Sequence, residues 1–297
     1  MKFQINGVIP AILTPFTKGG KSVDYDRVKA LAARLAGQGV HGLFVCGTTG
    51  EGPLMTLDER KLTLQAVVQE VGKRVTVVAH TGCFDTASTI ELTRHARDIG
   101  AKAAGIVAPG FFGYDDAALL AHYRAIAAAV KDFPILLYNI PGCAKNELTP
   151  PVVLELARTV DNIVGIKDSS GSMPNLNRVL ADKPADFTVI NGVDEYAMQA
   201  QIAGAAGFVA STANVLPEVF LGIYNSVKKG DLKKAWETQK KLGRACAAFC
   251  YGRMVARYKE GLRLRGFDAG YVRSPQRELT KQEKSELAKA LNAAGLI

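Results

Sequence analysis

The chain has 297 residues, of which 48% are hydrophobic, 22% charged and 7% aromatic. This composition is that of a globular protein and excludes an intrinsically disordered chain. The 37 basic and 28 acidic residues give a formal net charge of +9, which fits an anionic substrate, a nucleic acid or an acidic membrane surface. The basic residues gather after Lys228 on segments with helical periodicity and no interleaved aromatic residues. We therefore expect solvated helix faces and no nucleic-acid partner.

The cysteines and the apolar segments indicate in which cellular compartment the protein is located. The five cysteines are scattered and include no CxxC pair, which predicts reduced thiols rather than a disulfide framework or a zinc site. No segment reaches about 18 uninterrupted apolar residues, and the N-terminal sequence lacks an apolar stretch behind a basic start. We therefore expect no membrane association and a cytoplasmic location.

Eight short apolar runs alternate with longer amphipathic segments along the chain. An alternation in steps of roughly 20 to 35 residues is typical of a (β/α)8 barrel, although a doubly wound open sheet also alternates strands with helices. We favour the barrel, which commonly forms one domain of about 250 residues. The predicted strands cover residues 8–13, 42–46, 75–79, 103–108, 135–138, 163–166, 187–190 and 207–210.

Helical patterns fill the segments between these runs. Residues 24–38 carry apolar side chains on one face, and Thr56 with Glu59 forms a capping box that opens a helix over 57–71. A threonine–proline pair at 149–150 opens another helix. These patterns support the alternation of strands and helices.

The strand signals stop at about Val215. We therefore predict a barrel over residues 1–225, which carries the active site, and a C-terminal helical extension over residues 226–297. Helices in this last part are expected at 231–251, 253–265 and 280–292.

Lys167 is the most informative residue of the chain. It follows the β-branched run 163–166 and precedes Asp168 and a Ser-Ser-Gly turn. Burial disfavours the charged form of a lysine, so the neutral amine becomes available to attack a carbonyl and form a Schiff base. Taken alone, the segment fits better a lysine that ends a strand and extends into water, because most lysines are solvated.

A glycine-rich loop follows the second predicted strand. In a barrel the C-terminal ends of the strands form the catalytic face. There Gly47 would let backbone N–H groups approach a ligand, and Thr48 and Thr49 would donate hydrogen bonds to a carboxylate. A plain glycine turn is the alternative interpretation.

Three other strand ends carry chemistry. Tyr138 ends the fifth run, where a phenol next to the lysine could transfer protons, although a packed ring is the commoner role of such a tyrosine. Asp194 and Glu195 follow the seventh run and Ser211 the eighth, where they could hold a polyhydroxy substrate. One of the two acids could instead cap the next helix.

The histidines give no metal motif. His41, His80, His95 and His122 show neither HxH nor HExxH spacing, so we expect no metal. His80 follows the third run and either lines the site or is a core histidine.

The chain carries three motifs in a fixed order: Gly47-Thr48-Thr49-Gly50-Glu51, Tyr138-Asn139-Ile140-Pro141 and Gly165-Ile166-Lys167-Asp168-Ser169. Together, in that order and at those intervals, they resemble the dihydrodipicolinate synthase and N-acetylneuraminate lyase superfamily, and the resemblance covers essentially the whole chain. The resemblance implies a (β/α)8 barrel with a helical extension, usually tetrameric, that needs no cofactor. It also implies that Lys167 forms a Schiff base with pyruvate or another 2-oxo acid, that Tyr138 is the general acid and base, and that Thr48 and Thr49 hold the carboxylate and relay protons.

Two positions depart from the dihydrodipicolinate synthases of that superfamily. Cys143 stands where those enzymes carry an arginine, two residues beyond the proline of the YNxP motif. Phe112 aligns with the tyrosine that they lend to a neighbouring subunit, and phenylalanine cannot relay a proton. A role in lysine biosynthesis is therefore disfavoured unless Tyr114 substitutes.

Two other segments resemble the sugar-binding parts of N-acetylneuraminate lyases: Asn191-Gly192-Val193-Asp194-Glu195 and Ala210-Ser211-Thr212. We therefore expect an aldolase or dehydratase that acts on a 2-keto-3-deoxy sugar acid. The alternatives are a 4-hydroxy-tetrahydrodipicolinate synthase, an N-acetylneuraminate lyase-like enzyme, a barrel that binds a 2-oxo acid without catalysis, and a metal-dependent aldolase. The expected substrate-binding residues are Gly47, His80, Phe112, Ser169, Gly192, Asp194, Glu195, Val209 and Ser211.

Overall fold

Aliphatic and β-branched residues build eight short strands, almost all of them buried throughout. Such runs are expected in a parallel sheet, because helices or the barrel interior cover both of its faces. The computed structural model describes residues 3–297. Its strands are β1 (Gly7–Pro10), β2 (Gly42–Val45), β3 (Thr76–His80), β4 (Ala103–Val107), β5 (Ile135–Asn139), β6 (Ile163–Asp168), β7 (Thr188–Asn191) and β8 (Gly207–Ala210).

The strands close into a barrel. They pair in parallel in the order β1-β8-β7-β6-β5-β4-β3-β2. A parallel bridge between Ala11 and Phe44 then joins the two ends of the sheet, where the Ile12 N–H donates to the Phe44 carbonyl at 3.0 Å. The predicted (β/α)8 barrel is confirmed, and the open doubly wound sheet is excluded.

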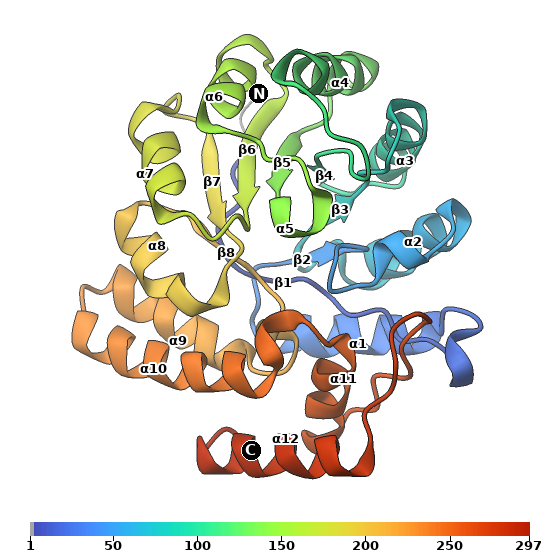
Figure 1. Ribbon diagram of the computed structural model, residues 1–297, viewed down its shortest axis with the longest axis vertical. Coiled ribbons are helices and arrows are strands. Elements are labelled where there is room, and N and C mark those ends of the chain that lie inside the picture. Colours follow the sequence, from blue (N-terminus) through green and yellow to red (C-terminus); the bar gives the residue numbers. More distant parts are fainter. Residues whose placement is uncertain (1–2) are drawn as a thin grey trace.

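Helices surround the barrel (Figure 1). Asp24 caps the first of them, and the predicted capping box of Thr56 and Glu59 opens the second. The barrel helices are α1 (Tyr25–Gly37), α2 (Leu57–Val71), α3 (Thr86–Asp98), α4 (Asp116–Ala129), α5 (Pro141–Ala144), α6 (Pro150–Thr159), α7 (Met173–Asp182), α8 (Ala197–Ala203) and α9 (Pro217–Lys228).

Three further helices, α10 (Leu232–Ala248), α11 (Val255–Leu264) and α12 (Lys281–Ala293), follow the barrel. They lie together beside α9 and α1 (Figure 1). The helix expected over 231–251 ends earlier, because Cys250 and Tyr251 both have a φ of 53°. Helix α9 runs across residue 225 and packs against α8 and β1.

The basic residues of α10 face solvent. Lys233, Lys234, Lys240 and Lys241 are exposed, whereas the opposite side of the helix is buried. This confirms the prediction of a solvated helix face for α10. The prediction was wrong for α11, where Lys259 is buried because it pairs with Glu51. All five cysteines are free thiols, and no helix within residues 3–297 combines the length and apolarity that crossing a bilayer requires.

Candidate active site

Lys167 and Tyr138 are neighbours across two paired strands. The register of β5 and β6 places Tyr138 opposite Lys167, and both side chains are almost completely buried, with 1% and 4% exposure for the tyrosine and the lysine. The Lys167 Nζ lies 3.7 Å from the centre of the Tyr138 ring. The structure thus places the phenol next to the amine, as the strand-end positions predict.

Hydroxyl groups join the glycine-rich loop to two other strand ends. The Thr48 hydroxyl is 3.1 Å from the Tyr138 hydroxyl, and the Thr49 hydroxyl is 2.6 Å from that of Ser211. In each pair either oxygen can be the donor. The Thr48–Tyr138 contact can therefore pass a proton in either direction next to Lys167.

Gly47 has a packing reason to be glycine. A Cβ at this position would lie 2.8 Å from the Phe44 ring, so a side chain there would displace that ring. The expectation that Gly47 lets backbone N–H groups approach a ligand stays a prediction. In the sequence, Phe44 is only one apolar residue of a predicted buried strand.

Ser169 and Gly192 meet where β6 and β7 end. The Ser169 hydroxyl donates to the Gly192 carbonyl at 3.3 Å, and the Gly192 N–H donates to the Asp168 carbonyl at 2.7 Å. A Cβ at Gly192 would lie 2.0 Å from the Ser169 Oγ. Glycine at this position therefore leaves room for the serine hydroxyl.

The two acidic residues after β7 differ in their surroundings. The half-buried Asp194 accepts a hydrogen bond from the Thr212 N–H at 3.1 Å, which ties the loop after β7 to the loop after β8. Burial raises the pKa of Asp194 to about 6, against the opposing effect of the bonds to Thr212. Glu195 is exposed. Neither acid caps α8, whose N-terminal cap is Tyr196 without a side-chain hydrogen bond, so the capping alternative was wrong.

Val209 lies inside the barrel. It is 2% exposed in β8, where it pairs with Ile9 and belongs to the same apolar cluster as Phe44 and Tyr138. Any contact that it makes with a substrate would be apolar.

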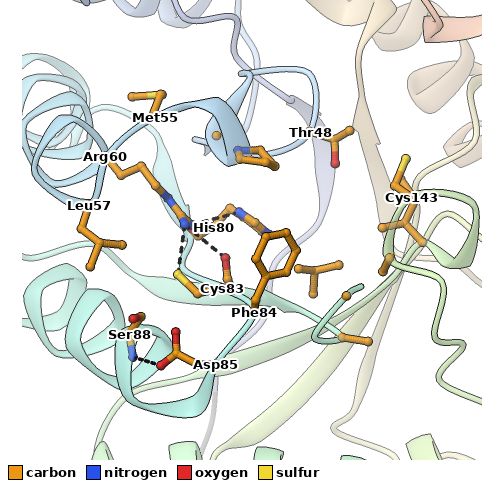
Figure 2. A pocket seen from close by; sticks show the side chains of 18 residues that line it. Thr48, Met55, Leu57, Arg60, His80, Cys83, Phe84, Asp85, Ser88 and Cys143 are labelled. Carbon is orange, nitrogen blue, oxygen red and sulfur yellow. Dashed lines mark hydrogen bonds between the residues drawn. The ribbon is translucent and has the colours of Figure 1, made fainter. Parts of the chain in front are cut away.

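The His80 ring lies next to the Tyr138 ring and contacts Arg60, an arginine that the sequence did not point to. Its Nδ1 lies 3.2 Å from an Arg60 amino group and 3.0 Å from the Cys46 carbonyl, and Arg60 also reaches Cys83 (Figure 2). Burial, with the charges of Arg60 and Lys167, holds the pKa of His80 well below 6.5. The imidazole is therefore neutral, and its Nε2 is buried without a hydrogen-bond partner. The sequence offered one signal for this contact. Arg60 is a charged residue on the same face of α2 as Leu64, and that face is buried.

Phe112 is not brought to Lys167 within one chain. It is 62% exposed on the loop before α4, where its ring packs edge-on against Phe111 at 5.0 Å. Its carbonyl accepts a hydrogen bond from Asn146.

A cavity of ≈ 310 Å³ adjoins the site. It lies between the loops that follow β2, β3, β4 and β5, and Thr48 and His80 line both the cavity and the site (Figure 2). Cys143, at the position where the related synthases carry an arginine, also lines it. The rest of the wall is mainly apolar and includes Met55, Leu57, Phe84, Val107 and Ile140.

No group of three or more histidine, cysteine, aspartate or glutamate side chains within residues 3–297 is arranged to hold a metal ion.

Known proteins resemble this chain over its full length. The model of the dihydrodipicolinate synthetase family matches residues 4–294. A 4-hydroxy-tetrahydrodipicolinate synthase of Methanopyrus kandleri is 35% identical over 297 residues, which cover 100% of this chain and 99% of that protein.

Two solved structures show the same fold. One is YagE, a prophage protein of E. coli K12 in complex with pyruvate, at a TM-score of 0.94 and 29% identity, covering 98% of this chain and 99% of that one. The other is a catalytic lysine mutant of Ruminococcus gnavus sialic acid aldolase, at 0.92 and 27%, covering 98% and 95%. The chain therefore belongs to the dihydrodipicolinate synthetase family and, with that family, to the lyases of the class I, Schiff-base-forming type.

Proposed function

We propose that Lys167 forms a Schiff base with the keto group of pyruvate or another 2-oxo acid and that the protein cleaves or dehydrates a 2-keto-3-deoxy sugar acid. The observation that carries this proposal is the buried pair of Lys167 and Tyr138, whose phenol is within hydrogen-bond distance of the Thr48 hydroxyl. An amine in such a site needs a partner that moves protons.

The first chemical step is addition and loss of water. The neutral Lys167 amine adds to the substrate C2 carbonyl and gives a carbinolamine. Tyr138, in contact with Thr48, delivers a proton to the C2 hydroxyl, which leaves as water and yields the iminium. Thr49 and Thr48 hold the substrate carboxylate in this proposal.

The iminium is an electron sink for the second step. In an aldolase, the C4 hydroxyl loses its proton, the C3–C4 bond breaks, and its electrons pass into the iminium to give an enamine and an aldehyde. In a dehydratase, a C3 proton is removed and the C4 hydroxyl leaves as water. Tyr138 is positioned to take and return the proton in either case.

The polar rim supports a hydroxylated substrate. Ser169, Asp194 and Ser211 lie at the ends of β6, β7 and β8, and the fold is that of a sialic acid aldolase. Glu195 and Phe112 belong to the proposed substrate-binding set only if a bound substrate or a second subunit brings them to the site.

A second candidate is the condensation of pyruvate with aspartate semialdehyde. The name of the Methanopyrus kandleri relative favours it. Cys143 weighs against it, because a thiol supplies no positive charge to bind the carboxylate of aspartate semialdehyde.

We further propose a homotetramer that acts in the cytoplasm without a cofactor. The exposed Phe111 and Phe112 side chains support burial against another subunit, and the free thiols fit a reducing compartment. Light scattering should give four times the chain mass of 31.7 kDa, and cell fractionation should recover the protein with cytoplasmic markers. A monomer, or recovery with the envelope, would contradict these two proposals.

Product analysis with 2-keto-3-deoxy sugar acids tests the reaction. Release of pyruvate identifies an aldolase, and a product lighter by one water identifies a dehydratase. Lys167→Met should abolish both, and EDTA should leave the activity unchanged. No turnover of any such acid would contradict the proposed substrate class, and EDTA-sensitive activity would favour the metal-dependent alternative.

A further inference from the structure

The amine of Lys167 lies against two aromatic ring faces. Its Nζ is 3.7 Å from the centre of the Tyr138 ring and 4.5 Å from that of Phe44. None of the ion pairs found within residues 3–297 includes Lys167. A positive charge at this nitrogen therefore meets ring faces before it meets a paired carboxylate.

Three rings form one cluster at this point, which we call the aromatic cage: Phe44, His80 and Tyr138. The Phe44 and Tyr138 rings are 5.6 Å apart and edge-on, and His80 lies 5.7 Å from Tyr138 and 5.9 Å from Phe44. Edge-to-face contacts of this kind stabilise the relative orientation of aromatic rings. The cage thus holds its ring faces in place before a substrate arrives.

The barrel interior leaves space for the Phe44 ring. Phe44 is completely buried. A Cβ at Gly105 on β4 would lie 2.4 Å from this ring, and a Cβ at Gly47 would lie 2.8 Å from it. The two glycines, one on β4 and one in the loop after β2, therefore leave room for the Phe44 ring. The ring is closely surrounded and has little freedom to move away from Lys167.

We propose that Phe44 is a further catalytic residue, whose ring face stabilises the positively charged iminium that Lys167 forms with substrate. The inference rests on the proposed role of Lys167. The neutral amine, the ketone and the carbinolamine carry no charge at this nitrogen. The carbinolamine then takes up one proton and releases water, so the iminium carries a positive charge there. A ring face attracts a desolvated cation strongly enough to change an equilibrium by about 2- to 30-fold. Phe44 therefore favours the iminium over the free ketone and amine.

Fluorinated phenylalanines at position 44 test this proposal. Fluorine withdraws electron density from the ring face and changes the ring shape little. The equilibrium constant for imine formation with pyruvate, measured by borohydride trapping and intact mass, should fall stepwise from Phe44 to its 4-fluoro, 3,5-difluoro and 3,4,5-trifluoro analogues. The total fall should reach about fivefold or more. A role in packing alone would not produce this graded dependence.

The same fluorinated series at Phe208 is the matched control. Phe208 is as deeply buried but packs against Phe220 and Tyr224, away from the cage. The equilibrium constant for imine formation of each fluorinated Phe208 variant should stay within about twofold of that of the wild type. Phe44→Leu, which keeps an apolar side chain but has no ring face, should lower the imine constant by about as much as three fluorines.

Two negative results have different meanings. An imine constant that is equal across the Phe44 series, in a protein that does form the imine, would overturn the role of Phe44 and leave that of Lys167 intact. Absence of any imine in the wild type would overturn the proposed Schiff-base role of Lys167 and, with it, this inference.

Discussion

Glu51 and Lys259 form a buried ion pair at 2.7 Å between side chains that are each 1% exposed. Their positions are 208 residues apart in the chain. Glu51 belongs to the glycine-rich loop that carries Thr48 and Thr49, and Lys259 belongs to α11 of the C-terminal extension. The extension is therefore attached directly to the loop that lines the active site.

Backbone groups complete this contact. The Lys259 ammonium also donates to the Thr14 and Tyr271 carbonyls, and the second Glu51 oxygen accepts from the Arg273 N–H at 2.9 Å. Burial raises the pKa of Glu51 and lowers that of Lys259, while the attraction between the two charges opposes both shifts. Loss of one partner would leave the other charge buried and unpaired.

Lys259→Met should lower the free energy of unfolding by about 3–5 kcal/mol, because removal of one partner of a buried ion pair is strongly destabilising. Denaturant titration measures this difference. The matched control is Lys240→Met, which removes an exposed partner of Glu237 and should cost no more than about 1 kcal/mol. Equal effects of the two substitutions would contradict a structural role of the buried pair.

Tyr138→Phe should slow imine formation with pyruvate by about 10²- to 10⁴-fold, because it removes the proton-transfer group but keeps the ring next to Lys167. Rapid-quench borohydride trapping measures the rate. Tyr123→Phe is the control, since Tyr123 is also buried and donates only to the Ile106 carbonyl. If Tyr138→Phe traps pyruvate as fast as Tyr123→Phe, Tyr138 is not the proton-transfer group.

Asp194→Asn should change how stability depends on pH. The folded-state pKa of Asp194, about 6, is raised above the ordinary value of 3.8 for an aspartate, so the folded protein binds this proton more tightly than the unfolded chain does. The resulting stabilisation is present below pH 3.8 and is lost as the pH rises through about 6. The melting temperature of Asp194→Asn relative to wild type should therefore rise between pH 4 and pH 7. A difference that is constant over this range would contradict the raised pKa.

Much of the fold and the centre of the site followed from the sequence. The strands contain short apolar runs, and in a parallel barrel the residues that follow such runs meet at one face. That rule alone placed Lys167 beside Tyr138. The same rule brought Thr48 into this group, and the family resemblance implied its role there.

Other features depend on tertiary packing and were not predictable from local pattern. Phe44 lies in a continuously apolar strand, where alternation does not reveal which side chains point into the barrel. Arg60 is charged, and its burial becomes visible only when its contacts with His80 are known. The Glu51–Lys259 pair joins segments too distant in sequence for any spacing rule to connect.

The central claim is that Lys167 forms the Schiff base. Intact mass spectrometry after incubation with pyruvate and sodium borohydride, followed by peptide mapping, tests it most directly. Lys259, the other lysine that is buried within residues 3–297, serves as an internal control for non-specific modification. We predict one reduced pyruvyl adduct per chain, on Lys167, and none in Lys167→Met. No adduct on the wild type, or an adduct on another lysine that persists in Lys167→Met, would contradict the account.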